Sequence, residues 1–231
     1  MPHYLILAVI LLALYVAGLY ALRYVKDKRW PNIVLPPMIF TCYLYVVITM
    51  YLDVGFHDWN FQNTLPTANV SPFTYCLALL SLVLPKKAKE YVYTLISLLS
   101  FGVLGAGMLS CISNAARDYA FHWTITLDSF AHVALSWFGV YLVKSGQVRL
   151  EPRKCLFSGL FIVGVAVVMM LLNVIFHTNF FGLSFRGEHN IYNMVLCESA
   201  YLSAGIYFLG LCAVLTVGYF YQKWLKALKK V

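Results

Sequence analysis

Charged side chains are scarce in this sequence. They make up 11% of the 231 residues, whereas hydrophobic side chains make up 61%. A soluble domain carries about a quarter charged residues, and no polar stretch in this chain is long enough to form one. The composition therefore excludes a soluble globular protein. It predicts a single transmembrane domain over residues 1–231, with lipid as its main solvent.

Cysteine pairs with the CxxC spacing of zinc and redox sites are also missing. The six cysteines fall mostly within apolar runs. We interpret them as small packing residues, and we expect neither a metal ion nor a cofactor.

The formal net charge of +8 does not indicate nucleic-acid binding. Every basic cluster stands directly beside an apolar run, where membrane topology and anionic headgroups account for it. We expect membrane lipid as the partner of this chain, and no nucleic acid. The sequence leaves open whether another membrane protein binds to it.

Several apolar segments have the length of a spanning helix, which needs about 20 mainly apolar residues. The third segment is shorter than the others and opens beside Pro72. The predicted helices cover residues 4–24, 33–53, 70–84, 91–112, 123–144, 155–177 and 198–221. The predicted fold class is an all-α integral membrane protein, a bundle of seven transmembrane helices.

The basic residues alternate between the two ends of these segments. One side holds fifteen of the seventeen lysines and arginines, and the other side holds only Arg117 and Arg186. Because lysine and arginine accumulate in cytoplasmic loops, we expect the N-terminus outside, the C-terminus in the cytoplasm and a multi-pass protein of the cell membrane. The tail Gln222–Val231, with Trp224 among lysines, is typical of an interfacial anchor.

Two ionisable residues lie within the fifth predicted helix, where such side chains are costly unless they are paired or face a cavity. Asp128 and His132 are one helical turn apart, so the carboxylate can orient the imidazole. Counted from Trp123, His132 lies roughly 13 Å deep at 1.5 Å per residue. Two such groups at depth favour a functional site over simple hydrogen bonding between helices.

Other polar residues reach the same outer side from three further helices. They are Asn69 and Ser71 at the third helix, Asn173 and Asn179 at the end of the sixth, and Glu198 at the seventh. The cytoplasmic halves hold few comparable groups. We infer a polar cavity in the extracytoplasmic half that suits an amphiphilic ligand. For Asn69, Asn173 and Glu198, hydrogen bonding between helices is an equally good interpretation.

Three short stretches share a pattern with a known family. They are Leu65–Pro72, which reads LPTANVSP; His132–Gly146, a histidine helix that ends in a tyrosine and a KSG turn; and Asn173–Phe180, which ends in TNF. These stretches resemble segments of the YwaF-type integral membrane proteins and of their eukaryotic relative, a transmembrane acyltransferase that acts on phospholipids. The resemblance extends over about residues 65–190.

The resemblance implies a lipid-modifying site in which a cysteine nucleophile works with a histidine. His132 matches the histidine of that family. Val70 or Ser71 stands about where the cysteine is expected, and Ala68 stands where the motif has its own histidine.

A first hypothesis is therefore a membrane-lipid acyltransferase or lipid hydrolase. His132 would be the general base, Asp128 its orienting carboxylate and Ser71 the nucleophile, with Cys76 as a weaker choice. Asn69 or Asn173 would donate hydrogen bonds to the oxyanion.

Two other hypotheses remain open. A seven-helix metal-dependent lipid hydrolase needs three or four converging ligands, but no HxxxH-type spacing links the candidates His57, Asp58, His122, Asp128, His132 and His177. A non-enzymatic protein would hold a small molecule in its outer cavity or assist another membrane protein. Polar groups confined to one half of the bundle argue against a complete transport path.

Overall fold

The computed structural model describes residues 2–22, 24, 29–52, 65, 69–116, 123–178, 180–182 and 200–227. Within these ranges the chain forms α-helices, one short 3₁₀ helix and no strand, which confirms the all-α class. The elements are α1 (Pro2–Ala21), α2 (Trp30–Leu52), α4 (Val70–Leu80), α5 (Lys86–Ala116), α6 (Trp123–Lys144), α7 (Pro152–Phe176), the 3₁₀ helix η1 (Phe180–Gly182) and α9 (Ala200–Ala227).

Helices α1, α2, α5, α6, α7 and α9 are each long and apolar enough to cross a membrane, which makes six candidate spans in the described part of the chain. Helix α4 is the exception, with 11 residues. At 1.5 Å per residue it is about 16 Å long, roughly half the thickness of a hydrocarbon core. The helix predicted over residues 70–84 is thus shorter than expected.

The early end of α4 has a local cause in Pro85. The Ser81 amide still bonds to the carbonyl four residues back, at 2.9 Å, but the amides of Leu82 and Val83 bond only three residues back. Proline disfavours helical geometry in the residue before it, so the chain tightens and turns. Helix α5 then begins at Lys86, directly after the proline, and earlier than the predicted residue 91.

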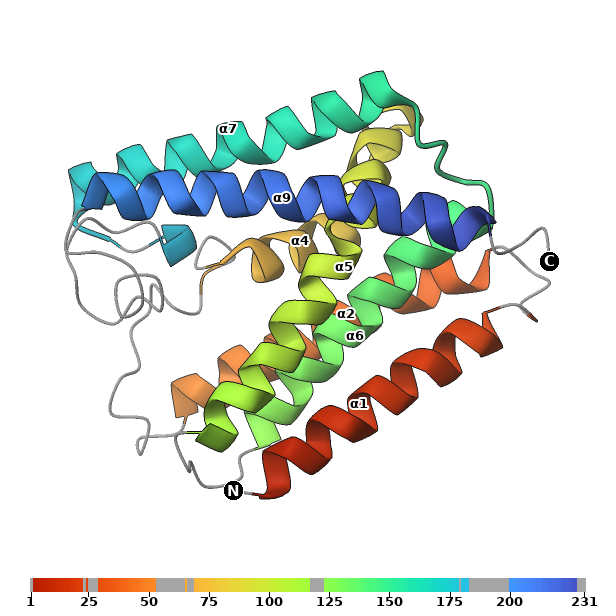
Figure 1. Ribbon diagram of the computed structural model, residues 1–231, viewed down its shortest axis with the longest axis horizontal. Helices are drawn as coiled ribbons and strands as arrows, with labels where there is room; N and C mark the ends of the chain where they lie inside the picture. Colours follow the sequence, from red (N-terminus) through yellow and green to blue (C-terminus); the bar gives the residue numbers. More distant parts are fainter. Residues whose placement is uncertain are drawn as a thin grey trace.

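Helices α5 and α6 form the centre of the bundle, and Figure 1 shows them side by side. Helix α5 packs on α1, α4, α6, α7 and α9, and α2 packs mainly on α6 and α4. Residues Ala131–Val143 of α6 are buried almost without interruption. The outer helices differ: α7 buries one stripe, and its other apolar side chains are half-buried or exposed, as expected for a helix that faces lipid.

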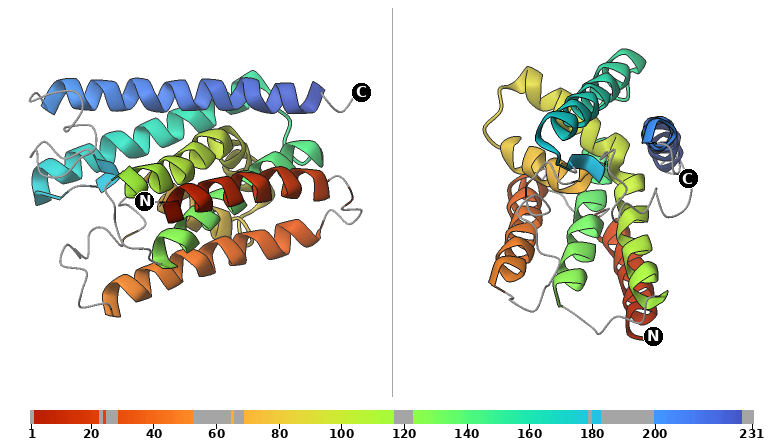
Figure 2. Two further views of the ribbon diagram at one scale, coloured as in Figure 1. Left: turned by 60° about the horizontal axis from the view of Figure 1, so that its bottom comes forward. Right: turned by 90° about the vertical axis from the view of Figure 1, so that its left-hand side faces the viewer.

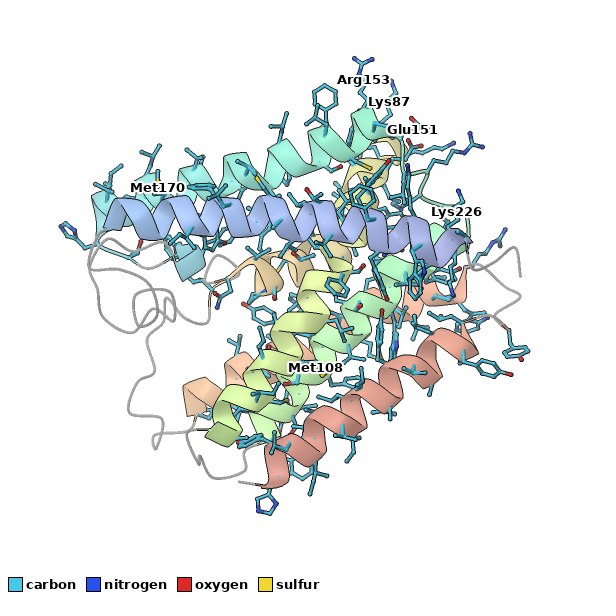
Figure 3. All side chains as sticks on the ribbon, viewed as in Figure 1. Lys87, Met108, Glu151, Arg153, Met170 and Lys226 are labelled. Carbon is cyan, nitrogen blue, oxygen red and sulfur yellow. The ribbon has the colours of Figure 1, made fainter. Side chains whose placement is uncertain are left out.

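The start of α1 and the end of α9 lie at opposite ends of the bundle (Figures 1 and 2). Lys87, Arg153 and Lys226 come from three different helices and lie at one end in Figure 3, the end at which α9 finishes. This gathering agrees with the alternation of basic residues along the sequence. Which end faces the cytoplasm stays a prediction of the positive-inside rule.

Candidate functional site

The site is built where a side chain of α4, which packs on α2 and α5, reaches across to α6. The hydroxyl of Tyr75, on α4, lies 2.7 Å from Nδ1 of His132, on α6. The two rings meet edge to face, with centroids 5.6 Å apart. Tyr75 is fully buried, and His132 is 7% exposed. This contact joins two helices through residues that are 57 positions apart in the sequence.

The Nδ1 atom of His132 has a second partner, the backbone carbonyl oxygen of Asp128 at 2.8 Å. Because a carbonyl oxygen can only accept, this contact favours the tautomer with the proton on Nδ1. In that tautomer the hydroxyl oxygen of Tyr75 accepts from the same N–H. The Asp128 carboxylate lies farther away, with Oδ2 3.6 Å from Nδ1, and its side chain keeps 34% of its exposure.

The other ring nitrogen of His132 carries the lone pair in this tautomer. Nε2 makes no hydrogen bond to any residue that the structure describes, since every hydrogen bond recorded for the ring is on Nδ1. An imidazole held through Nδ1 and free at Nε2 has the arrangement of a general base in many active sites.

A glycine allows α5 to approach the histidine closely. A Cβ atom built on Gly107 would lie 2.8 Å from Cβ of His132, closer than real Cβ contacts. One turn farther along α5, Sγ of Cys111 lies 3.3 Å from Oγ of Ser129 on α6. The imidazole is therefore enclosed on its α5 side by backbone and by a second polar contact between the helices.

Ser71 lies on α4 four residues before Tyr75, and therefore one turn away on the same face of that helix. It is half-buried, and within the described ranges it makes no hydrogen bond to His132. The histidine's partner on α4 is Tyr75 instead. Cys76, the weaker candidate, is half-buried next to Tyr75 in the sequence. The nucleophilic roles of both residues stay predictions.

Asn173 is occupied by its own end of α7. Its Oδ1 accepts hydrogen bonds from the Thr178 hydroxyl at 2.8 Å and from the Phe180 amide at 2.6 Å, and its Nδ2 donates to the Phe180 carbonyl at 2.9 Å. These bonds close the turn after His177, which takes the left-handed conformation, with φ of 55°. The asparagine thus holds a local turn rather than linking two helices.

That turn places an aromatic side chain beside α4. Phe181 also has φ of 55°, which is uncommon for a large residue, and it is 1% exposed. Its ring packs edge to face on Phe73, with centroids 5.7 Å apart. The end of α7 therefore reaches the helix that carries Tyr75.

The remaining predicted residues have no observed role. Asn69 is the exposed N-cap of α4, and its side chain makes no capping hydrogen bond. Asn179 and Glu198 lie outside the described residues, as do His57, Asp58 and His122 of the metal hypothesis. Among the described residues, no group of three metal-ligating side chains comes together.

The sequence interpretation missed a second buried polar cluster, nearer the basic end of the bundle. Gln222 of α9 is 0% exposed, and its Nε2 donates to the Ser97 carbonyl at 3.1 Å and to the Ser100 hydroxyl at 2.7 Å, both on α5. The Ser97 hydroxyl also lies 3.1 Å from the Gly139 carbonyl of α6. Gln222 was expected in an interfacial tail, but α9 continues to Ala227 and buries it.

Six long apolar helices in the described ranges define a multi-pass integral membrane protein, because four of them, α1, α2, α7 and α9, leave most of their apolar span unburied. The chain belongs to the TMEM164 family, whose model matches residues 1–222. No curated protein and no solved structure matches the chain.

Proposed function

We propose that this protein transfers a fatty acyl group between membrane lipids, with Nε2 of His132 as the general base. One observation carries the proposal: a nearly buried imidazole is tethered through Nδ1, while Nε2 has no partner among the described residues. The resemblance to YwaF-type proteins and the eukaryotic phospholipid acyltransferase supports the same chemistry.

The proposed reaction needs one proton shuttle. Nε2 removes the proton from the hydroxyl of an acceptor lipid as that oxygen attacks the ester carbonyl carbon of a donor lipid. The tetrahedral oxyanion collapses, the bond to the donor's alcohol oxygen breaks, and Nε2 returns the proton to that alcohol. Water in place of the acceptor hydroxyl would give hydrolysis. The histidine is neutral before and after the cycle.

Tyr75 and Asp128 are positioning residues in this proposal. Their contacts hold the imidazole plane and fix the tautomer with the proton on Nδ1. The Asp128 carboxylate, 3.6 Å from Nδ1, stabilises the imidazolium that forms while the proton is on the ring. Asp128 therefore stabilises the imidazolium without itself accepting the proton.

The route through a protein nucleophile is a variant of the same function. Oγ of Ser71 would attack the donor ester first and hold the acyl group, and the acceptor hydroxyl would then release it. The hydrogen bonding of His132 to Tyr75 rather than to Ser71 favours direct transfer. With Ser71→Ala, direct transfer predicts a turnover within about threefold of the wild type and the serine route predicts a loss of 10²-fold or more.

The site is proposed to open toward the extracytoplasmic leaflet. The orientation follows from the gathering of basic residues at the opposite end of the bundle. Single cysteines introduced at His3 and at Val231, in a chain whose native cysteines are replaced by serine, test it with a membrane-impermeant maleimide. Labelling of the first position alone is expected on intact cells. Labelling of both or of the second alone would contradict the orientation.

The enzymatic claim is tested with purified protein in phosphatidylcholine nanodiscs. Lysophosphatidylethanolamine is the acceptor, an isotope-labelled oleoyl chain marks the donor, and mass spectrometry measures the transferred label. His132→Gln keeps a polar side chain that cannot accept the proton, so turnover should fall by about 10²–10⁴. His177→Asn is the matched control, because His177 is an exposed histidine at the end of α7 and asparagine tolerates its left-handed backbone.

Two outcomes would contradict the proposal. Equal turnover by the His132→Gln protein and the wild type would remove the histidine from the mechanism. Absence of both transfer and hydrolysis by folded wild-type protein, over a panel of glycerophospholipid donors, would favour the non-enzymatic function instead.

A further inference from the structure

A polar groove lies at the basic end of the bundle, where the segment joining α6 to α7 passes the start of α5. Its volume is about 410 Å³, near the lower end of the range for small-molecule sites. Lys86, Glu90, Arg149, Glu151 and Lys154 supply its charged lining. This size suits a headgroup rather than a whole lipid.

The charges in the groove are only partly paired. Nζ of Lys154 lies 3.1 Å from Oε2 of Glu90 and 3.6 Å from Oε1 of Glu151, so one lysine occupies both carboxylates. Lys86 and Arg149 are exposed and have no carboxylate within 4.0 Å among the described residues. The groove therefore offers two unpaired cations beside a triad of one lysine and two glutamates, and the charged side chains of its lining sum to a net charge of +1.

The segment between α6 and α7 is ordered by its own hydrogen bonds. The Gly146 amide bonds to the Val143 carbonyl at 3.1 Å, and the Val148 amide bonds to the Leu142 carbonyl at 3.0 Å. Gln147 accepts a hydrogen bond from Asn32 of α2 at 2.7 Å. Arg149 thus projects from a segment whose backbone is fixed before any ligand arrives, which lowers the entropy cost of binding.

The position of the groove indicates where its ligand comes from. Figure 3 shows Lys87, Glu151 and Arg153 around this end of the molecule. Beyond the groove, the exposed surface of α7 is apolar, and Leu156 and Leu160 are 60% and 54% exposed. A molecule with its charge in the groove can therefore lay acyl chains along α7.

We propose that this groove binds the phosphate-bearing headgroup of an anionic membrane phospholipid. Lys86 and Arg149 contact the phosphate, and the guanidinium can do so with two parallel hydrogen bonds. The acyl chains of the lipid lie against the apolar face of α7. Along α5, 21 residues or about 30 Å separate Lys86 at the groove from Gly107, which lies against His132, so this lipid is an anchoring or regulatory ligand and is distinct from the proposed substrate.

The test uses the full-length protein in a neutral detergent and dihexanoyl phosphatidic acid as the probe. Binding is measured by titration calorimetry, and dihexanoyl phosphatidylcholine and inorganic phosphate are titrated in parallel. The double variant K86Q/R149Q should weaken binding of phosphatidic acid about 30-fold, at about fivefold for each basic residue. K223Q/K226Q removes the same charge at the same end, outside the groove, and should change binding less than twofold.

Each result decides the proposal. Equal weakening by the two double variants would show a general charge effect and would overturn the site. Inorganic phosphate bound as tightly as phosphatidic acid, with the same dependence on Lys86 and Arg149, would identify free phosphate as the ligand and overturn the lipid. Both substituted residues are exposed, so an unchanged unfolding temperature is expected, and single variants with about fivefold losses each provide a second reading.

Discussion

The bundle contains two polar clusters that differ in what can reach them. The inner cluster, Ser97, Ser100 and Gln222 with the Gly139 carbonyl, joins α5, α6 and α9, and its three side chains are 0% exposed. The site cluster, Tyr75, Asp128 and His132, keeps a partly exposed carboxylate and a histidine that is 7% exposed. Both clusters hold hydrogen-bonding atoms without a partner among the described residues. The site cluster presents its unpaired atom next to accessible surface.

The unpaired atom of the inner cluster, Oε1 of Gln222, is sealed. It has no hydrogen-bond partner in the described structure and almost no accessible surface. Such atoms either bind an enclosed water molecule or reduce stability. A lipid ester could not approach them. The comparison teaches that a polar group within a membrane bundle indicates chemistry only where its unpaired hydrogen-bonding atom is accessible to a substrate.

The inner cluster also connects helices that are distant in sequence. Near it, the hydroxyls of Tyr15 and Tyr221 share a hydrogen bond between α1 and α9, and Trp137 of α6 donates to the Tyr15 carbonyl at 3.0 Å. Neutral groups bonded to backbone in this way act as interhelical connections. We therefore assign stability to this region and chemistry to the site cluster.

The largest effect outside the catalytic base is expected at Gly107. A valine there would push on Cβ of His132, which already lies 2.8 Å from a built Cβ, and would displace the imidazole. We expect Gly107→Val to lower turnover by about 10²-fold and stability by about 1–3 kcal/mol. Turnover is measured by the nanodisc assay, and stability by thermal unfolding.

Gly105, on the same helix, provides the control. A Cβ atom at Gly105 meets nothing within 4 Å in the described structure, so Gly105→Val should leave both quantities nearly unchanged. If the two valine variants lost turnover to the same extent, the close approach of α5 to the histidine would not matter for function.

A smaller effect is expected from Tyr75→Phe. The change removes the hydroxyl that contacts Nδ1 at 2.7 Å but keeps the buried ring. Turnover should fall about tenfold because the imidazole is held less firmly, and stability should fall by about 1 kcal/mol. Tyr91→Phe, at a 42% exposed tyrosine on α5, should lower neither turnover nor stability. Full activity of Tyr75→Phe would reduce Tyr75 to a packing role.

The smallest effect on turnover is expected from Gln222→Leu. The variant loses two hydrogen bonds to α5 but fills the same space, and it removes the unpaired Oε1. Stability should change by about 1 kcal/mol, as for other interhelical hydrogen bonds in membranes, and turnover per folded molecule should not change. Thermal unfolding in detergent measures the first and the nanodisc assay the second.

Hydrophobic length predicted most of the helices. The helix expected at 123–144 has the bounds of α6, and most other bounds differ by a few residues. The third helix was predicted too long because its apolar residues run on through Leu84, and a continuous apolar run does not show where a helix gives way to a turn. The turn is instead set by Pro85, which restricts the backbone before it.

The site was only partly predictable. The spacing of Asp128 and His132 placed them together because contacts one turn apart within a helix follow from its geometry. The contact with Tyr75 depends on how α4 is placed by its packing on α2 and α5, which no local pattern encodes. Asn173 was predicted as a site residue because it is polar and lies within a predicted span, but its hydrogen-bond partners are Thr178 and Phe180, within seven residues.

Acyl transfer per folded molecule, measured side by side for His132→Gln and Gln222→Leu, tests the central claim most directly. Both substitutions alter a buried polar side chain of the same bundle, one in each cluster. The account predicts a loss of about 10²–10⁴ for the histidine variant and wild-type turnover for the glutamine variant. Similar losses in both, or full turnover by the histidine variant, would contradict the division of the bundle into a chemical and a structural cluster.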